Sequence, residues 1–413
     1  RVMGVLATRL RPGTAWEVPA SVQPPTYEAF QHYARASEYW VRGRYGEAAE
    51  GYMRAYEADT TFLRSMLIGI AAYGQAGDAR RMDSLFQVIQ PRRDELAPYD
   101  RYRLDYGMAD RRGDLPGRLQ AARAGVDLVS GGTLHLALVS TLGAMNRPRE
   151  ALDNLQEIWP ETQALFPEWF VLWNLQTELH HRLGDHVREL ELAREGKSLS
   201  PGSLHMLTFE GRALAALGDL EALEEVVDQI LGTPSVPGRT VGESLEELAL
   251  ELRAHGHEAQ ASIILGQGLS WVDRRPTPEA GSPRNRLLLG RLLYLEGRWE
   301  EALEVFRELA AEGVSSVAVV GYQGVLAARL GHPEGAREVS RELSGEAPTG
   351  PGALKTLWQA RIAAVSGKRD EAMAFLRRAY QEGMGFGLWL HRDVDLETLH
   401  GYPPFQEWTR PKG

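Results

Sequence analysis

Three histidines and an aspartate in the stretch ELHHRLGDHVREL carry side chains that can bind a metal ion: His180, His181, Asp185 and His186. His181 and Asp185 are four residues apart, so a continuous helix would place both ligands on one face. Gly184 stands between them, and a glycine at this point predicts the end of the helix. We therefore interpret the group as solvated surface, where histidine is often found, and predict no metal site.

The triplet His391-Arg392-Asp393 has the order found in one kind of catalytic loop, that of the protein kinases. That loop continues with Leu and carries an Asn four residues further on. Val394 and Thr398 stand at these positions, and the sequence has neither a glycine-rich loop after a strand nor a Val-Ala-Ile-Lys motif. The triplet is therefore interpreted as part of a C-terminal capping segment.

No other pattern of catalytic residues is complete. The glycines of GMGFG, residues 383–387, follow a helical stretch rather than a strand, which predicts a helix end and a loop instead of a phosphate site. Acidic pairs such as Glu246-Glu247 are interpreted as solvated faces. The chain has no Cys, which excludes disulfides, thiolate metal sites and cysteine nucleophiles. We predict neither enzymatic activity nor a cofactor.

Aromatic residues gather in the stretch WPETQALFPEWFVLWN, namely Trp159, Phe166, Trp169, Phe170 and Trp173. One hypothesis makes this group an apolar site for a peptide. The helical spacing favours the other interpretation, in which the rings form the packing core between two neighbouring helical units.

Composition narrows the class of partner but leaves the compartment open, because a chain without Cys suits either redox environment. The net charge of −10 is spread over 413 residues without a basic face or tail, so nucleic acid is not the expected partner. The uncharged stretches 128–146 and 313–328 contain Gly and Ser and are too short to predict membrane spans. The sequence begins at Arg1 without a secretion signal, and we expect it to be a piece of a longer protein. The expected compartment is the cytoplasm, with the periplasm or another extracytoplasmic position as the alternative.

A repeat of helix–turn–helix units must position these groups. A glycine, or once an asparagine, recurs at intervals of 33 to 41 residues, each time after a helical apolar stretch. Gly ends helices readily because it adopts positive φ, and Asn is the next best residue. The ten turn positions are Gly43, Gly77, Gly113, Asn146, Gly184, Gly218, Gly256, Gly297, Gly331 and Gly367. The spacing predicts ten hairpins and an all-α helical-repeat solenoid.

Two loops rich in Pro and Gly interrupt the rhythm, at residues 232–242 and 273–285, and their composition predicts no helix. We expect an N-terminal helix and linker at residues 1–25, units one to seven at 26–272, and units eight to ten at 286–382. Residues 383–413 are expected to cap the array, because the open end of a solenoid exposes an apolar face. The loop at 273–285 is either a hinge between the two blocks or a plain surface loop.

The unit around Gly297 resembles the tetratricopeptide repeat family through Gly290, Trp299, Ala302 and Phe306. The unit around Gly43 is also similar to that family, with matching residues at Tyr39, Tyr45, Ala48, Tyr52 and Ala55. The resemblance covers roughly residues 26–382 and implies a right-handed solenoid whose concave groove is lined by the first helix of each unit.

The two ends carry a second resemblance. Residues 24–62 and 388–408 are similar to the junction and the array end of bacterial multidomain regulators with TolB-like domains, which include receptor-type serine/threonine kinases and cyclases. This resemblance implies a signalling or regulatory protein whose output domain lies upstream of Arg1.

Two hypotheses for function follow. The first is a non-catalytic scaffold that binds a protein or peptide partner in the groove, through Arg more than Lys; the oligomeric state stays open. Its candidate groove residues, from the family's first-helix positions and from polar residues on predicted first helices, are Asn174, Glu178, His205, Thr208, Arg212, Arg253, Arg291 and Tyr294. The second is a small-molecule or anion sensor with an enclosed pocket, built from Arg103, His205, Arg212, Arg253 and Arg291. The plain alternative for Arg212 and Arg291 is pairing with nearby acids such as Glu178.

Overall fold

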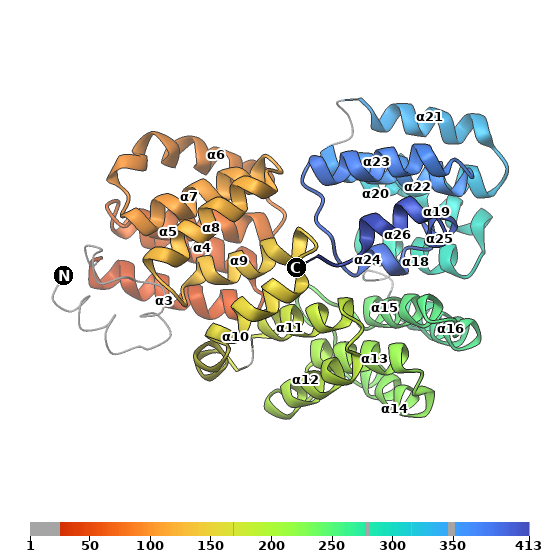
Figure 1. Ribbon diagram of the computed structural model, residues 1–413, viewed down its shortest axis with the longest axis horizontal. Helices are drawn as coiled ribbons and strands as arrows, with labels where there is room; N and C mark the ends of the chain where they lie inside the picture. Colours follow the sequence, from red (N-terminus) through yellow and green to blue (C-terminus); the bar gives the residue numbers. More distant parts are fainter. Residues whose placement is uncertain are drawn as a thin grey trace. The chain divides into compact units, whose positions relative to one another are not determined.

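The structure, a computed structural model, describes residues 25–167, 169–276, 279, 281–314, 316–345 and 352–412. The N-terminal helix and linker expected at residues 1–25 lie outside the described residues, apart from Pro25. The described chain is all-α, as predicted (Figure 1). One isolated antiparallel bridge joins Val236 and Arg239. None of its helices has the length and apolar character needed to cross a bilayer.

Ten helical hairpins follow one another along the described chain, each made of a first and a second helix. The hairpins are α3(Tyr27–Val41)/α4(Tyr45–Ala58), α5(Leu63–Gln75)/α6(Ala79–Ile89), α7(Pro98–Arg111)/α8(Leu115–Leu128), α9(Thr133–Ala144)/α10(Pro148–Leu165), α11(Phe170–Arg182)/α12(His186–Leu199), α13(Leu204–Leu217)/α14(Leu220–Leu231), α15(Val241–Ala254)/α16(Glu258–Asp273), α18(Pro283–Leu295)/α19(Trp299–Ala311), α20(Val317–Arg329)/α21(Pro333–Leu343) and α22(Gly352–Val365)/α23(Arg369–Gln381). A 3₁₀ helix, η1(Gln90–Glu95), follows α6, and α24(Trp389–Arg392), α25(Glu397–His400) and α26(Pro403–Thr409) end the chain.

The turns of the hairpins confirm the predicted positions. All ten turn residues have positive φ, from 60° at Asn146 to 81° at Gly256. Asn146 is the one residue other than glycine with positive φ in the part of the chain that is described. A left-handed residue ends the first helix and lets the chain reverse within two or three residues, which is why the turn signal is local enough to read from the sequence.

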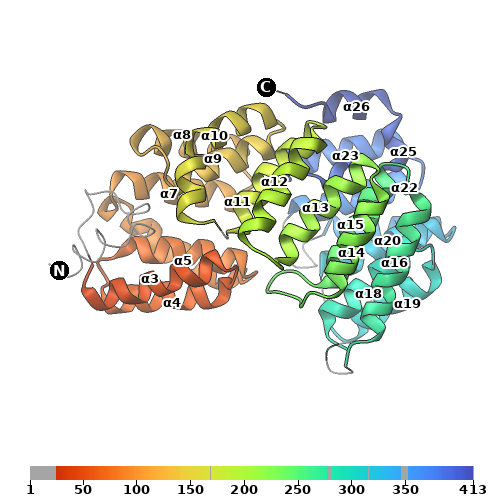
Figure 2. The same cartoon turned by 90° about the horizontal axis from the view of Figure 1, so that it is seen from below.

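The chain divides into two compact units, one ending at Leu175 and the other covering Gln176–Lys412. In the first unit, aromatic rings pack within and between the first two hairpins: Tyr33 lies 5.3 Å from Tyr52 of its own hairpin and 5.2 Å from Phe62 of the next, measured between ring centroids. In the second unit, the core runs continuously from α13 to α22 through buried residues such as Leu248 and Phe306. Figure 2 shows the helices α13 to α19 of this unit side by side.

The last residues of the second unit pack against its final hairpin. Leu396, Leu399 and Phe405 are buried in one cluster with Leu357 of α22 and Leu376 of α23. Burial of apolar side chains at the end of an array removes the exposed face that a terminal hairpin would otherwise present to water.

The two interrupting loops are shorter than predicted, so the expectation of no helix over their whole length is wrong. Helix α15 begins at Val241, because Thr240 and Glu243 form a reciprocal capping box. Helix α18 begins at Pro283, a residue suited to the first helical position because its missing N–H is not needed there.

The turn geometry makes a prediction about matched glycine substitutions. Gly297 has φ of 78°, so Gly297→Ala should lower the free energy of unfolding by about 1–2 kcal/mol. Gly266 lies inside α16, is exposed and has no atom within 4 Å of the space that a Cβ would fill. Gly266→Ala should therefore raise the free energy of unfolding by about 0.5–1 kcal/mol. Chemical denaturation of both variants measures the difference, and effects of equal sign would contradict the assignment of Gly297 as a left-handed turn.

Candidate peptide-binding face of the second unit

The chain's own C-terminal segment, residues 387–399, lies along first helices of the second unit. Gly387 lies beside α11, since a Cβ there would be 3.6 Å from Glu178 Oε1. At the other end of the segment, the Thr398 hydroxyl donates to the carbonyl of Ala364 in α22 at 3.2 Å. We call the surface formed by the second-unit part of α11 together with α13, α15, α18, α20 and α22 the first-helix face.

Two aspartates of the segment bind arginines of this face. Arg361 of α22 donates through Nε to Asp393 at 2.7 Å, and Arg329 of α20 donates through Nη2 to Asp395 at 3.0 Å. Asp395 also accepts from the hydroxyl of Tyr294 in α18. Both aspartates are buried. Burial raises the pKa of Asp393 to about 6, with the neighbouring Asp395 carboxylate adding to the shift and Arg361 opposing it.

Two further ion pairs fix the segment to α15. Arg253 Nη2 lies 3.5 Å from Glu397, and Arg392 Nη1 lies 3.2 Å from Glu247. Glu247 is shared, because Arg239 Nη1 lies 2.8 Å from it as well. Burial opposes the ionisation of Glu247, but the arginines around it outweigh that cost and lower its pKa.

A fully buried ion pair lies behind these contacts. Arg212 of α13 donates through Nε to Glu189 of α12 at 2.7 Å and through Nη2 to Thr177 of α11 at 3.0 Å. The exposed fractions of the Arg212 and Glu189 side chains are 1% and 0%. Burial opposes ionisation of Glu189, but Arg212 and the bond to His181 outweigh it and lower its pKa to about 2.

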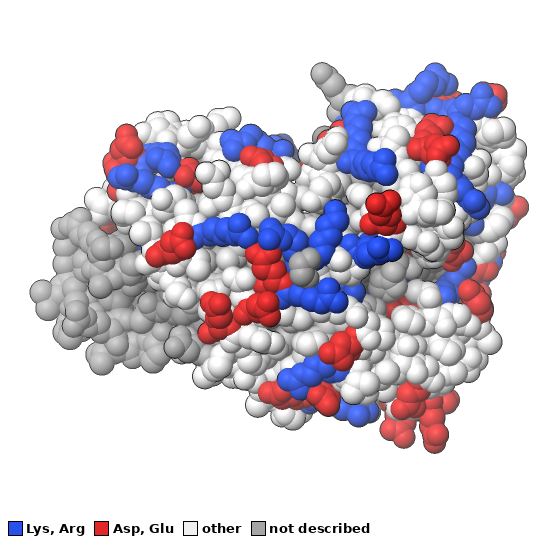
Figure 3. All heavy atoms as spheres, in the orientation of Figure 1, with Lys and Arg blue, Asp and Glu red and all other residues white. Residues whose placement is uncertain are grey.

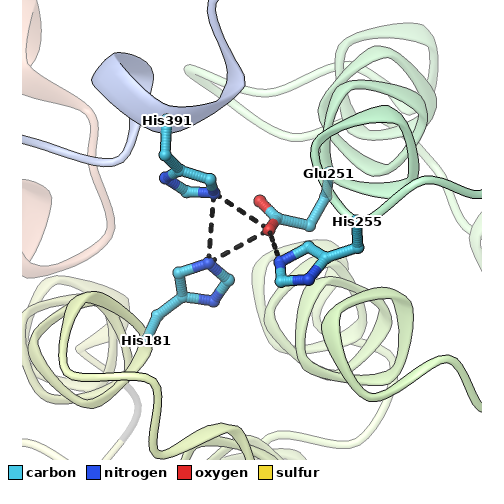
Figure 4. Close-up of side chains that lie close together, drawn as sticks. All are labelled: His181, Glu251, His255 and His391. Carbon is cyan, nitrogen blue, oxygen red and sulfur yellow. Dashed lines mark hydrogen bonds and ion pairs between the residues drawn. The ribbon is translucent and has the colours of Figure 1, made fainter. Parts of the chain in front are cut away.

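Three imidazoles converge on one carboxylate in this unit (Figure 4). Glu251 Oε1 of α15 lies 3.0 Å from the Nε2 atoms of His181, His255 and His391. His181 Nε2 and His391 Nε2 lie 3.4 Å apart. The opposite ring nitrogen of His181, Nδ1, lies 2.7 Å from Glu189 Oε2. These donor atoms come from α11, the end of α15 and α24, so the fold joins residues that are 210 positions apart.

The interpretation of the His180–His186 stretch as solvated surface is wrong for His181, which is buried. Gly184 ends α11, as expected, so His181 does not share a helical face with Asp185. Its partners are instead brought by α12, α15 and α24. Burial opposes protonation of His181, but the Glu189 and Glu251 carboxylates outweigh that cost and raise its pKa.

The aromatic group belongs to the packing core, as its helical spacing predicts. Trp173 and Trp169 are buried, and the Trp159 and Trp173 rings meet edge to face at 5.1 Å between centroids. The Trp173 indole N–H donates to the carbonyl of Pro167. These contacts all lie in the first unit.

Two of the predicted groove residues, Arg253 and Tyr294, contact the C-terminal segment, and Glu178 lies beside it. Two others are buried in the second unit. The Thr208 hydroxyl lies within hydrogen-bond distance of the Leu204 carbonyl and the Ser244 hydroxyl, and Arg212 pairs with Glu189. Arg291 pairs with Glu246 and His205 is half-buried, while Asn174 belongs to the first unit.

Three of the four arginines proposed for an anion pocket already face carboxylates of this chain. Arg212 pairs with Glu189, Arg253 with Glu258 and Arg291 with Glu246. Arg212 and Arg291 therefore pair with acids, as the plain alternative predicted, but their partners are Glu189 and Glu246 and not Glu178. Arg103 belongs to the first unit, where it donates to Thr133. On the surface, Figure 3 shows Lys and Arg side chains interspersed with Asp and Glu in each unit.

Sequence reasoning missed most partners in this network. Glu247 was interpreted as a solvated acid, but its side chain is only 12% exposed and lies within 4 Å of three arginines. His391, Arg392 and Asp393 were recognised as a capping segment rather than as ligands of a distant helix. The sequence signal that could have indicated these contacts is the stretch HRDVDLE, residues 391–397, in which charged residues alternate with apolar ones beside leucines that are buried in the fold.

The buried pair predicts unequal costs for two arginine substitutions. Arg212→Ala leaves Glu189 ionised and without its main partner in the interior, and should lower the free energy of unfolding by about 3–5 kcal/mol. Arg298→Ala removes an exposed pair with Glu301 and should cost less than about 1 kcal/mol. Denaturant titration compares the two, and equal small losses would show that the Arg212 pair is hydrated in solution.

His205 predicts a pH effect. Burial, followed by the charge of Arg239, lowers the pKa of His205 to about 4, below the 6.5 of an unperturbed histidine. Between pH 6.5 and 4, the unfolded chain is therefore protonated at His205 while the folded chain is not. The contribution of His205 to the free energy of unfolding falls as the pH drops through this range. His205→Gln should make the loss of stability over this range shallower, as measured by thermal unfolding at a series of pH values. An unchanged slope would show that His205 is hydrated.

No protein-family model and no curated protein matches this sequence. Among solved structures, the chain is similar to a tetratricopeptide repeat protein from Parabacteroides merdae, with 14% identity over 73% of this chain and 99% of the other and a TM-score of 0.35. It is also similar to the APC/C hetero-tetramer Cut9-Hcn1, with 11% identity over 85% and 76% and a TM-score of 0.32. A third similar structure is the human IFIT1 dimer with m7Gppp-AAAA, with 12% identity over 92% and 94% and a TM-score of 0.34. Likeness at this level assigns neither a family nor a function to the chain.

Proposed function

We propose that the chain is a non-catalytic interaction scaffold whose second unit binds extended acidic peptide segments along the first-helix face, as part of a larger bacterial signalling or regulatory protein. One observation carries the proposal: the chain's own residues 391–397 already lie there, with carboxylates bound by arginines of three different first helices. Among the groove residues expected from the sequence, Arg253 and Tyr294 contact this segment, and arginines rather than lysines bind its carboxylates, which supports the proposal.

Arginine suits this role because its planar fork matches a carboxylate and stays charged at every physiological pH. Arg361 lies over the Trp358 ring at 4.4 Å, and Arg329 lies over Tyr294 at 5.1 Å, measured from the guanidinium carbon to the ring centroid. An arginine held over a ring is oriented before a ligand arrives, which reduces the entropy lost on binding.

The C-terminal segment has the advantage of being tethered. A tethered ligand acts at an effective concentration in the millimolar range, so a free peptide of similar affinity competes poorly. A partner must therefore carry a better acidic segment, or bind when the C-terminal segment is released. Arg291, Glu178 and His205 are the candidate residues for additional partner contacts beside the segment; Asn174 is a candidate in the first unit alone.

The test is a competition experiment on the full chain with a labelled peptide that copies residues 388–399. Wild-type chain should bind this peptide weakly, because the tethered copy occupies the site. The double variant Asp395→Asn plus Glu397→Gln loosens the tethered copy and should bind the peptide at least tenfold more tightly. Fluorescence anisotropy measures both, and a scrambled peptide of the same composition controls for charge.

Second-site variants locate the binding. In the loosened chain, Arg329→Ala plus Arg361→Ala should weaken peptide binding at least tenfold. Arg337→Ala removes an exposed arginine from the second helix α21 and should leave binding unchanged. Peptide affinity that is unchanged by Arg329→Ala plus Arg361→Ala, or peptide binding that is absent from the loosened chain, would overturn the proposed function.

A further inference from the structure

The cluster of His181, Glu251, His255 and His391 has the donor set of a transition-metal site. Three imidazole Nε2 atoms and a carboxylate oxygen all lie within 4.8 Å of one another. Figure 4 shows the four side chains pointing toward a common centre from three elements. Neutral imidazole nitrogen and carboxylate oxygen are ligands that Zn²⁺ and related divalent ions prefer.

The spacing of the donors agrees with tetrahedral coordination. Bonds of about 2.0–2.1 Å to a central ion place tetrahedral ligand atoms about 3.3 Å apart. Four of the six donor–donor distances are close to this value: 3.0 Å from Glu251 Oε1 to each Nε2 atom and 3.4 Å from His181 Nε2 to His391 Nε2. The other two, from His255 Nε2 to each of the other imidazoles, are within 4.8 Å, so a bound ion would draw the His255 ring inward.

Hydrogen bonding alone leaves the cluster poorly satisfied. Three imidazoles share one oxygen of Glu251, while its second oxygen, Oε2, is buried and has no hydrogen-bond partner among the described residues. The charge nearest to that oxygen is Arg392 Nη1 at 3.8 Å, and Arg392 lies closer to Glu247. Two ring nitrogens also face each other at 3.4 Å, an arrangement that needs a hydrogen between them or a cation.

A supporting hydrogen bond orients His181 as metal-binding histidines are commonly oriented. Its Nδ1 lies 2.7 Å from Glu189 Oε2, and Glu189 is itself held by Arg212 at 2.7 Å. Donation from Nδ1–H to a carboxylate leaves the lone pair of Nε2 directed at the cluster and raises its basicity. This chain of contacts is independent of the donor distances and points to the same role.

From these observations we infer that His181, Glu251, His255 and His391 form a binding site for one divalent ion of the Zn²⁺ class. His181 and Glu251 form its buried wall, whereas the side chains of His255 and His391 are 27% and 38% exposed and leave a path for the ion. A bound ion would connect α24 to α11 and α15. The inference stands apart from the proposed function, because metal binding and peptide competition are measured separately.

The test uses the full chain without an affinity tag, freed of metal by a chelator. Calorimetric titration with ZnSO₄ should show one ion bound per chain. Bound Zn²⁺ should raise the melting temperature, as measured by thermal unfolding. Co²⁺ in place of Zn²⁺ should give the intense visible absorption of a tetrahedral site. Mg²⁺ and Ca²⁺ serve as hard-ion controls and should not bind, since they prefer oxygen ligands.

Four single variants test the assignment. His255→Ala and His391→Ala replace partly exposed ligands, so both should fold, and each should weaken Zn²⁺ binding at least tenfold. Glu189→Gln should weaken it by about 10–100-fold through His181. His180→Ala is the matched control, because His180 lies next to His181 on α11, and this variant should bind Zn²⁺ like the wild type. Absence of stoichiometric Zn²⁺, or affinity that survives both His255→Ala and His391→Ala, would overturn the inference.

Discussion

Burial of carboxylates in the second unit is the constraint on which that unit depends. Glu189, Glu251, Asp393 and Asp395 are buried side chains, and an ionised carboxylate in an interior is tolerated only with close cationic or hydrogen-bonded partners. The required partners come from helices and a segment far apart in the sequence, so satisfying each acid also fixes where the C-terminal segment lies. Apolar packing of Leu396, Leu399 and Phe405 on the last hairpin then anchors the end of that segment.

This arrangement links architecture to binding. Stacked hairpins align their first helices, so polar positions on successive first helices can face one segment. In α18, α20 and α22 these positions hold Tyr294, Arg329 and Arg361, and each contacts an aspartate of the same short segment. The C-terminal segment thus combines two roles, as a cap through its leucines and as an acidic ligand through its carboxylates.

The sequence revealed the turns and hairpins because their signals are local: positive φ at a glycine or Asn146 depends on residues within one turn of helix. The aromatic core was predictable for the same reason. The network was not, because His181 meets His391 only after several hairpins have stacked, and single-sequence periodicity carries no information on such pairing. The first-helix positions that line the groove in the tetratricopeptide pattern nevertheless selected Tyr294 and Glu178, because a residue's position within a first helix is also a local property.

The most direct test of the account is a double-mutant cycle between Arg329 and Asp395, the pair that holds the C-terminal segment against α20. Unfolding free energies of the wild type, Arg329→Ala, Asp395→Ala and the double variant give the coupling between the two side chains. The account predicts a favourable coupling of about 1–3 kcal/mol, as for charge pairs in contact and largely out of water. Coupling indistinguishable from zero would mean that the segment does not lie on the first-helix face in solution and would contradict the account.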